Sequence, residues 1–306
     1  MIATLTLNPA IDKIAHVKKL IVGDLNRLND VRMSVGGKGI NVARTLRALN
    51  ERTEVFTITA GTAGMLVEQY LRSNYYMAHI VKAEGNTRTN IKIIEEDGSL
   101  TEINDAGPVV TKEILNLLTI KMVRSLKKGD TIVLSGSIPD SVPTAIYKDL
   151  ILKAKDAGIH TILDADGEPF REGVTALPDI VKPNVRELRG YFGVTEQIDE
   201  KETCLLAQKL AKQGIGLVAA SMGHQGAVFA SADHAYYAKA VNVHTDSTVG
   251  AGDAMVGAIA FARHAGYDDE KLIRISMAAS AAACMSHGVN MAIVEKLMDE
   301  VEIVSL

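Results

Sequence analysis

The sequence of 306 residues contains no tryptophan and only two cysteines, Cys204 and Cys284. Each cysteine lies within a helical pattern, so neither a disulfide framework nor a cysteine-rich metal site is indicated, and a reducing, cytoplasmic setting fits best. Aromatic residues make up 4% of the chain, which argues against stacking on nucleic-acid bases. The formal net charge of -4 likewise argues against nucleic acid or an anionic membrane as the main partner.

The chain also lacks a long hydrophobic run. Residues 277–285 form its most apolar stretch, but they are alanine-rich and too few to span a bilayer. The first seven residues have no basic segment and are followed by Asn8 and Pro9, so they predict a first strand and not a signal peptide. The eight histidines show no zinc-binding spacing, and we interpret His244 and His287 as structural. We therefore expect a soluble protein that binds no membrane.

Helical and strand-like patterns alternate over most of the chain. Strands are predicted at residues 3–7, 55–58, 131–134, 160–163, 179–182 and 216–221. Amphipathic helices are predicted between them, at residues 40–49, 112–126 and 202–213. Because parallel strands need crossover connections, this alternation predicts an α/β fold with a mostly parallel sheet that helices cover on both faces.

Two stretches break the alternation, residues 13–34 and 87–105. Both contain short alternating segments and turns, so they predict antiparallel strands. Such strands would form a small β-lid over the carboxyl edge of the sheet, where open α/β folds bind ligands. Since the sequence has no Pro- or Ser-rich linker, we expect one domain over residues 1–306 that carries this lid.

A glycine-rich segment at 246–253 follows a strand-like pattern at 241–245 and precedes an apolar helix at 254–265. The glycines permit a sharp turn into the helix, whose first N–H groups and dipole can hold an anion. The residues that would form this turn are Gly250, Ala251 and Gly252.

Asp253 ends this segment. The field of the helix start would keep its carboxylate ionised and able to accept a proton from a hydroxyl group. The alternative is a Gly-rich loop in which Asp253 is an ordinary N-cap. The segment matches neither the P-loop nor the dinucleotide-binding fingerprint, so its function depends on evidence from elsewhere in the chain.

A second glycine-rich segment, 36–41, leads into the first predicted helix. Its glycines, Gly37 among them, let the backbone approach a ligand closely, and Lys38 supplies a charge suited to phosphate. Asn41 would hydrogen-bond sugar hydroxyls from the first helical turn. The alternative is a tight turn with a solvent-exposed lysine.

Polar residues also follow two predicted strands and lie along a third. Asp12 follows the first strand, where it would either bind sugar hydroxyls or cap a turn. Arg88, Asn90 and Lys92 share one face of a lid strand and would clamp an anionic substrate, unless that face is merely solvated. Ser137 follows another strand but lacks the spacing of a nucleophile elbow, so hydrolase chemistry is not indicated.

Asn184 and Glu187 admit two interpretations. Their spacing is that of a capping box, but Glu187 could also hold Mg²⁺, directly or through water. The segment 221–226 reads as a strand, a turn and the start of a hairpin, and its backbone could bind nucleotide phosphates.

Together these segments resemble the signature sequences of the ribokinase-like PfkB family of sugar kinases. Segments 36–43 and 246–253 are similar to the two family motifs, and five others follow in the family's order, at 8–12, 87–90, 135–139, 184–187 and 221–226. The resemblance covers nearly the whole chain. It implies a three-layer α/β/α fold with a β-lid and an ATP- and Mg²⁺-dependent kinase.

The resemblance also implies roles for single residues. Asp253 would be the general base, and the N–H groups of Gly250, Ala251 and Gly252 an anion hole. The sugar phosphate would contact Asp12, Gly37, Lys38, Asn41, Arg88, Asn90 and Ser137. ATP would contact Lys182, Asn184, Ser221, Gly223 and Gly226, with Mg²⁺ at Glu187 through water. A monovalent cation such as K⁺ would bind carbonyls of Ser247, Val249 and Gly288, and the lid would form a homodimer interface.

Segment 87–92 makes the chain most similar to the bacterial members that convert fructose 1-phosphate to fructose 1,6-bisphosphate. Kinases of tagatose 6-phosphate or fructose 6-phosphate are alternatives, and a non-catalytic sugar-phosphate sensor is a further one. The chain departs from the family pattern at Asp166, where relatives more often have Ser or Thr, at residues 74–76 and at residues 284–290.

Overall fold

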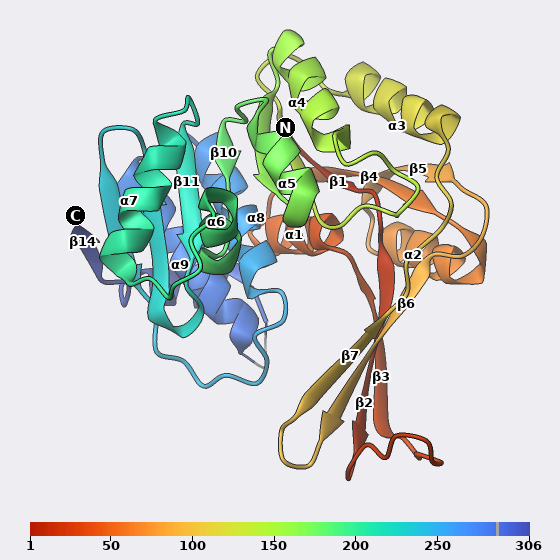
Figure 1. Ribbon diagram of the computed structural model, residues 1–306. Helices are drawn as coiled ribbons and strands as arrows, with labels where there is room; N and C mark the ends of the chain where they lie inside the picture. The colour runs from red at the N-terminus through yellow and green to blue at the C-terminus, as the bar shows by residue number, and fades with distance from the viewer. Residues whose placement is uncertain (286–287) are drawn as a thin grey trace.

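The computed structural model describes residues 1–285 and 288–306 and shows a three-layer α/β/α fold with a second, smaller sheet (Figure 1). Within these residues the large sheet has the order β14-β13-β12-β11-β10-β9-β8-β1-β4-β5. Neighbouring strands are parallel from β5 to β11, and β12, β13 and β14 are added antiparallel. Its strands are β1 Ile2–Thr6, β4 Thr53–Thr59, β5 Met77–Lys82, β8 Thr131–Ser135, β9 His160–Asp164, β10 Ile180–Val181, β11 Leu217–Ser221, β12 Gly226–Ala230, β13 Ala235–Lys239 and β14 Ile303–Ser305.

Helices cover both faces of this sheet, as the alternating pattern predicted. Successive strand residues point to opposite faces, so Ile132 and Leu134 join one apolar cluster while Val133 joins the other. The first cluster also takes in α3 Lys112–Ser125, α4 Ile146–Asp156, α5 Gly167–Val174, α6 Val185–Phe192 and α7 Glu200–Ala211. The second takes in α1 Lys38–Ala48, α8 Ala251–His264, α9 Asp269–Cys284 and α10 Met291–Met298, and α2 Gly61–Ser73 packs in a third cluster beside α1.

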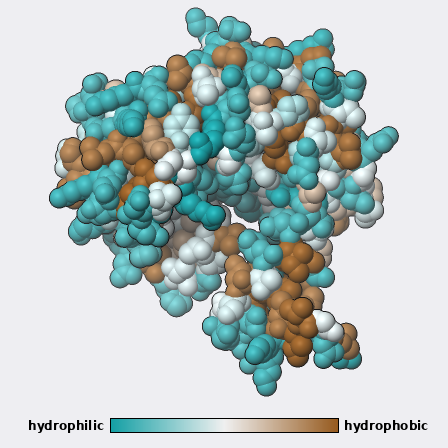
Figure 2. Space-filling view, viewed as in Figure 1, coloured by the Kyte–Doolittle hydropathy of each residue, from teal (hydrophilic) through white to brown (hydrophobic). Residues whose placement is uncertain are grey.

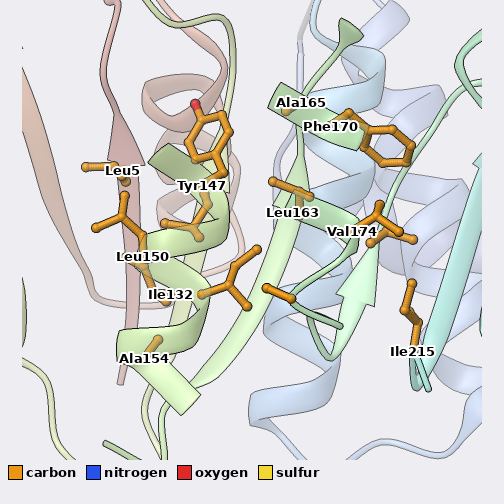
Figure 3. Close-up of a cluster of buried hydrophobic side chains, with 14 of the residues drawn as sticks. Leu5, Ile132, Tyr147, Leu150, Ala154, Leu163, Ala165, Phe170, Val174 and Ile215 are labelled. Atoms are coloured by element: carbon orange, nitrogen blue, oxygen red, sulfur yellow. The ribbon is translucent and has the colours of Figure 1, made fainter. Parts of the chain in front are cut away.

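The first cluster also supports the edge of the sheet at which β8 ends. Tyr147 is fully buried among Leu5, Leu150 and Leu163, and its hydroxyl group points out of the cluster (Figure 3). That hydroxyl donates a hydrogen bond of 2.8 Å to the carbonyl oxygen of Gly136. The bond fixes the turn that follows β8, and with it the position of Ser137.

Each of the six predicted strand ranges contains a strand, but two details of the pattern were misleading. The range 179–182 holds only Ile180 and Val181, because Pro183 has no N–H with which to extend the ladder. The range 241–245 is not a strand. There Val241 and Val243 pack against the second cluster while the residues between them are exposed, so the alternation belongs to a loop with one packed side.

The small sheet consists of β2 Ala10–Val17, β3 Asn29–Gly36, β6 Arg88–Glu95 and β7 Leu100–Asn104, in the order β3-β2-β6-β7. β2–β3 and β6–β7 are antiparallel, but the central pair β2–β6 is parallel, so the expectation of antiparallel strands was wrong there. The reason is that both β2 and β6 leave the carboxyl edge of the large sheet, with Ala10 beside Arg88. The small sheet projects from that edge (Figure 1).

No helix among the described residues is long and apolar enough to cross a membrane.

Candidate active site

The start of α8 forms one wall of the candidate site. Its N-cap is Gly250, which has a φ of 87° and offers no side chain to the first-turn N–H groups. Asp253 is therefore a first-turn residue, and its interpretation as the N-cap was wrong. Ala251 and Gly252 line a cavity of about 830 Å³, so the uncapped end of the helix is accessible to a ligand.

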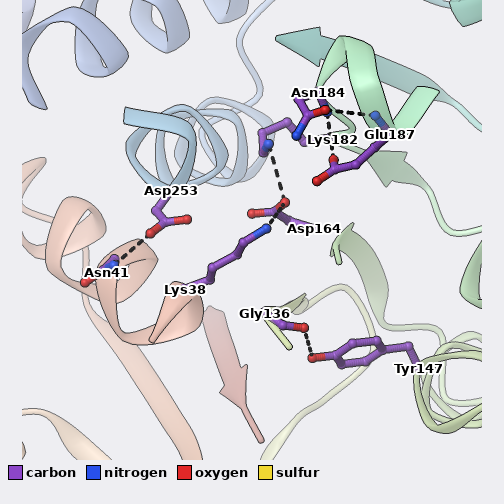
Figure 4. Close-up of polar contacts among 9 residues, drawn as sticks. All are labelled: Lys38, Asn41, Gly136, Tyr147, Asp164, Lys182, Asn184, Glu187 and Asp253. Carbon is purple, nitrogen blue, oxygen red and sulfur yellow. Dashed lines mark hydrogen bonds and ion pairs between the residues drawn. The ribbon is translucent and has the colours of Figure 1, made fainter. Parts of the chain in front are cut away.

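The carboxyl group of Asp253 is 9% exposed and accepts a hydrogen bond of 2.7 Å from Asn41 Nδ2 (Figure 4). Burial and then the negative charge of Asp164 raise its pKa to about 6, against the opposing effects of Asn41, Lys38 and Lys182. The helix start therefore does not hold this pKa at its ordinary value, but the carboxylate remains mostly ionised at neutral pH and able to accept a proton, as predicted.

The start of α1 forms the opposite wall. Its N-cap, Gly37, has a φ of 112° and no capping side chain, as at α8. A Cβ atom on Gly39 would come within 2.6 Å of the carbonyl oxygen of Leu5, so glycine is needed for α1 to approach β1. This close packing places Lys38 and Asn41 at the end of β1.

Lys38 is not the solvent-exposed residue of the alternative interpretation, because its side chain is 33% exposed and ion-paired. Its Nζ lies 3.1 Å from Oδ1 of Asp164, and Nζ of Lys182 lies 3.4 Å from the same oxygen. Burial would lower the pKa of Lys38, but attraction to Asp164, Glu187 and Asp253 raises it. Burial would raise the pKa of Asp164, but the two lysines lower it. The sequence analysis missed Asp164, although a carboxylate at the end of a central strand was a usable signal.

Several of the residues predicted to contact a sugar phosphate lie where the small sheet joins the large one. Asn90 Nδ2 donates to Asp12 Oδ1 at 3.0 Å, and Arg88 Nε donates to the carbonyl oxygen of Asn8 at 3.2 Å. Burial lowers the pKa of Arg88, against attraction to three nearby carboxylates. Seven buried side-chain oxygen atoms have no hydrogen-bond partner among the described residues, and three of them belong to predicted or neighbouring residues here, namely Asn8 Oδ1, Asn90 Oδ1 and Ser137 Oγ. Since buried polar groups are rarely left unpaired, these atoms mark a place for a polar ligand.

Lys92, by contrast, does not join this group as a free cation, because its Nζ lies 3.3 Å from Oε1 of Glu102. The predicted three-residue clamp is therefore reduced to Arg88 and Asn90.

Of the two interpretations of Asn184 and Glu187, the capping box is confirmed, and the Mg²⁺ site stays a prediction. The capping box is present, with Asn184 Oδ1 accepting from Glu187 N and Glu187 Oε2 accepting from Asn184 N, both at 2.8 Å. Glu187 also lines a second cavity, of about 640 Å³, together with Ser137 and Asp166. The cap uses Oε2 only, so Oε1 can still serve a metal through water.

Most of the residues predicted to contact ATP line the larger cavity. The segment 221–226 is a strand end, a 3₁₀ turn (η1, Gly223–Gln225) and a hairpin, as predicted. Lys182 lies between this cavity and Asp164, with Nζ 3.5 Å from the position that a Cβ atom on Gly252 would take. The predicted residues that line the cavity are Asn184, Ser221, Gly223, Gly226, Ala251 and Gly252.

The predicted cation-binding loop lies beside the end of α9, because Asp246 N donates to the Cys284 carbonyl at 2.9 Å. Val249 N donates to Ser247 Oγ at 3.2 Å. A cation site at Ser247, Val249 and Gly288 stays a prediction. His244 is exposed, and His287 lies outside the described residues.

Comparison with known proteins gives a consistent picture. The model of the pfkB family of carbohydrate kinases matches residues 5–296. The chain is 31% identical to 1-phosphofructokinase of Bacillus subtilis over 307 residues, which is all of both chains. It is 30% identical to tagatose-6-phosphate kinase of Staphylococcus epidermidis, over 90% of this chain and 89% of that one.

Solved structures of phosphofructokinase-2 from Escherichia coli superpose with a TM-score of 0.90, cover 97% of this chain and 98% of theirs, and are 26% to 27% identical. They include complexes with fructose-6-phosphate and with potassium, and a tetrameric inhibited form.

Proposed function

Because this chain belongs to the pfkB family of carbohydrate kinases, we propose that it transfers the γ-phosphoryl group of ATP to fructose 1-phosphate, giving fructose 1,6-bisphosphate. The observation that carries this proposal is a buried carboxylate, Asp253, between two helix starts that glycine leaves uncapped. Two lysines accompany it. Phosphoryl transfer needs such a base together with groups that neutralise moving charge.

Asp253 would accept the proton of the acceptor hydroxyl as that oxygen attacks the γ-phosphorus. The bond between the γ-phosphorus and the bridging oxygen then breaks, and ADP leaves with the electron pair. N–H groups of Gly250, Ala251 and Gly252 would hold the charge that develops on the phosphoryl oxygens. The bond from Asn41 Nδ2 to Oδ2 would hold the Asp253 carboxylate in a fixed orientation for this proton transfer.

Fructose 1-phosphate would bind between the small sheet and α1. Arg88 and Lys38 offer positive charge to its phosphate, and Gly37 allows close approach. The hydroxyl groups would pair with Asp12, Asn90 and Ser137, and Oδ1 of Asn90 and Oγ of Ser137 are among the unpartnered oxygens. Asn8, which the sequence analysis did not select, offers a further acceptor.

ATP would occupy the larger cavity beside Lys182, Asn184, Ser221, Gly223 and Gly226. The described residues contain no cluster of three or more His, Cys, Asp or Glu side chains for a metal. Mg²⁺ fits this donor set, since it binds through few carboxylates and completes its shell with water and phosphate oxygens. When bound near Glu187 it would supply charge neutralisation to the phosphates. Activity would also depend on K⁺ at Ser247, Val249 and Gly288.

The small sheet would act as the lid of a single kinase domain and as a homodimer interface. Apolar side chains gather on it (Figure 2). The exposed ones are Val31, Met33, Leu100 and Ile103 on its strands and Ile21, Val22, Leu25 and Leu28 on the loop between β2 and β3. An exposed apolar patch on a soluble protein commonly marks an interface. Sedimentation of the protein and of Met33→Glu tests this: the variant should be monomeric, and an unchanged species would reject the interface. We expect the enzyme in the cytoplasm.

The test of the substrate is a comparison of kcat/KM for fructose 1-phosphate, tagatose 6-phosphate and fructose 6-phosphate, with ADP release as the readout. We expect fructose 1-phosphate to give the highest value. A higher value for either of the other two sugars would replace it as the substrate. Thermal stabilisation by these sugars without ADP release would instead favour a sensor.

A further inference from the structure

Asp164 is the last residue of β9, and it is the most buried charged group of the site, with 1% of its surface exposed. Its Oδ1 atom contacts both lysines, from α1 on one side and from the segment after β10 on the other (Figure 4). Its Oδ2 atom has no partner among the described residues. The two lysines are therefore the groups that compensate the negative charge of this carboxylate among the described residues.

We propose that Asp164 is a positioning residue of the phosphoryl-transfer site, whose Oδ1 atom holds the ammonium groups of Lys38 and Lys182 side by side at the open ends of α1 and α8. This inference rests on the proposed kinase function. Lys38 begins α1 on the sugar side, and Lys182 lies against Gly252 in the first turn of α8. Sharing one oxygen fixes the two cations relative to each other before either substrate binds.

Electrostatics explain why this arrangement needs Asp164. Two ammonium groups so close together repel each other, and burial adds a desolvation cost to each. A buried ion pair is weak evidence for a stabilising role, because well-packed apolar residues often replace one without loss. Preorganised charge, in contrast, is what phosphoryl transfer requires, since groups that need not move at the moment of reaction stabilise the transition state best.

Asp164 also acts on the base. The groups that shift the pKa of Asp253 are Asp164 on β9, Asn41 and Lys38 on α1, and Lys182 after β10. Glu187 on α6 in turn raises the pKa of Lys38. Removing the Asp164 charge takes away a repulsion and leaves two cations uncompensated. Both changes favour the ionised form of Asp253, so its pKa should fall.

The experiment compares the pH dependence of kcat/KM for the wild type and Asp164→Asn. For the variant, the acid limb should move from about pH 6 to lower pH, by roughly one unit or more, while kcat at the optimum falls about tenfold or more. Asp164→Glu keeps the charge but displaces the oxygen, so kcat should fall with the acid limb near its original position. An unmoved limb in Asp164→Asn would overturn the proposal.

Asp179→Asn is the matched control. This carboxylate lies at the opposite end of the same strands, where it accepts hydrogen bonds of 2.8 and 2.9 Å from the backbone N–H and the hydroxyl of Thr161. The control should leave the acid limb in place even if it lowers the melting temperature. A limb that moves equally in the control would show a general effect of the fold, and would also overturn the proposal.

If Asp164→Asn does not fold, Lys182→Met gives an independent test. Methionine preserves the apolar stem, and Asp164 keeps its pair with Lys38. Removing one compensating cation should move the acid limb to higher pH, and an unmoved limb would refute the coupling on which the proposal rests. A wild-type protein that releases no ADP with any of the three sugars would refute the kinase function instead, so the two failures are distinguishable.

Discussion

Two pairs of helices in this protein begin in contrasting ways. α7 and α9 start at Asp199 and Asp268, whose side chains accept hydrogen bonds from the backbone N–H groups of Glu202 and Lys271. α1 and α8 start at glycines with positive φ and receive no bond from a capping side chain. Side-chain caps satisfy N–H groups that would otherwise be unpaired. The two glycine starts keep such groups available, and both lie at the candidate site.

This difference shows that the helix starts at the candidate site are less stabilised than capped helix starts elsewhere in the fold. A side-chain cap stabilises a helix by about 1 kcal/mol relative to alanine, and glycine at the same position forgoes only a few tenths of that, so a glycine start leaves a small deficit. At α8 the deficit is combined with a second one, because Asp253 is buried beside the negative charge of Asp164. An active site is expected to contain such locally unfavourable arrangements, and the surrounding packed sheet holds them in place.

The largest effect should follow from removing the base at the open start of α8. Asp253→Asn is expected to lower kcat by at least about 10²-fold, since a positioned base contributes roughly 10² to 10⁴ in rate. KM should change little, because an amide oxygen can still accept the bond from Asn41. Steady-state ADP release measures both constants, and turnover near that of the wild type would exclude the role of Asp253.

The same variant should be more stable than the wild type at pH 8. The folded pKa of Asp253 is raised to about 6 from 3.8, so ionisation costs folding free energy, and that cost is present above about pH 6 and disappears as pH falls. The gain in melting temperature should therefore shrink at pH 5. A gain that does not depend on pH would show that burial of this charge is not the cause.

A smaller effect is expected from a side chain added to the predicted anion hole, with Asp253 left unchanged. In Gly252→Ala the new Cβ would lie 3.5 Å from Lys182 Nζ, an ordinary contact, so the fold should persist. The methyl group would displace a phosphate by up to an ångström, and we expect kcat/KM for ATP to fall about tenfold to a hundredfold. The control is Gly129→Ala between α3 and β8, where a Cβ meets open space away from the site, so activity should be unchanged even if the positive φ of this residue makes the variant less stable. Equal kinetics for both variants would contradict the anion hole.

The wild-type pH profile should show a milder effect. Below pH 6, kcat/KM should fall roughly tenfold per pH unit as Asp253 gains a proton. The measurement is a set of initial rates between pH 5 and pH 8 at constant ionic strength. An acid limb near pH 4 would mean that the open helix start, and not burial, controls this carboxylate.

The glycine starts of α1 and α8 could be predicted from the sequence, because each depends on residues close together in the chain. Gly250 and Asp253 are neighbours in the chain, and glycine before an apolar helix has few structural meanings. The ion pairs of Asp164 could not be predicted in this way, since its partners are Lys38 and Lys182, and only the packed sheet joins them. The parallel pairing of β2 with β6 was missed for a similar reason. The direction of those strands is set by the sheet edge from which they leave.

The smallest effect should come from removing the side-chain cap of α9. In Asp268→Ala the bond of 2.8 Å from Lys271 N to Asp268 Oδ1 is lost, at a cost of about 1 kcal/mol. Because the residue is exposed and lies at the far end of α8 from the site, kcat and KM should not change. The melting temperature should fall by about 2 °C, as expected for a chain of this size. A change in kcat without loss of stability would mean that α9 influences the catalytic helix, and that the two kinds of helix start are not functionally separate.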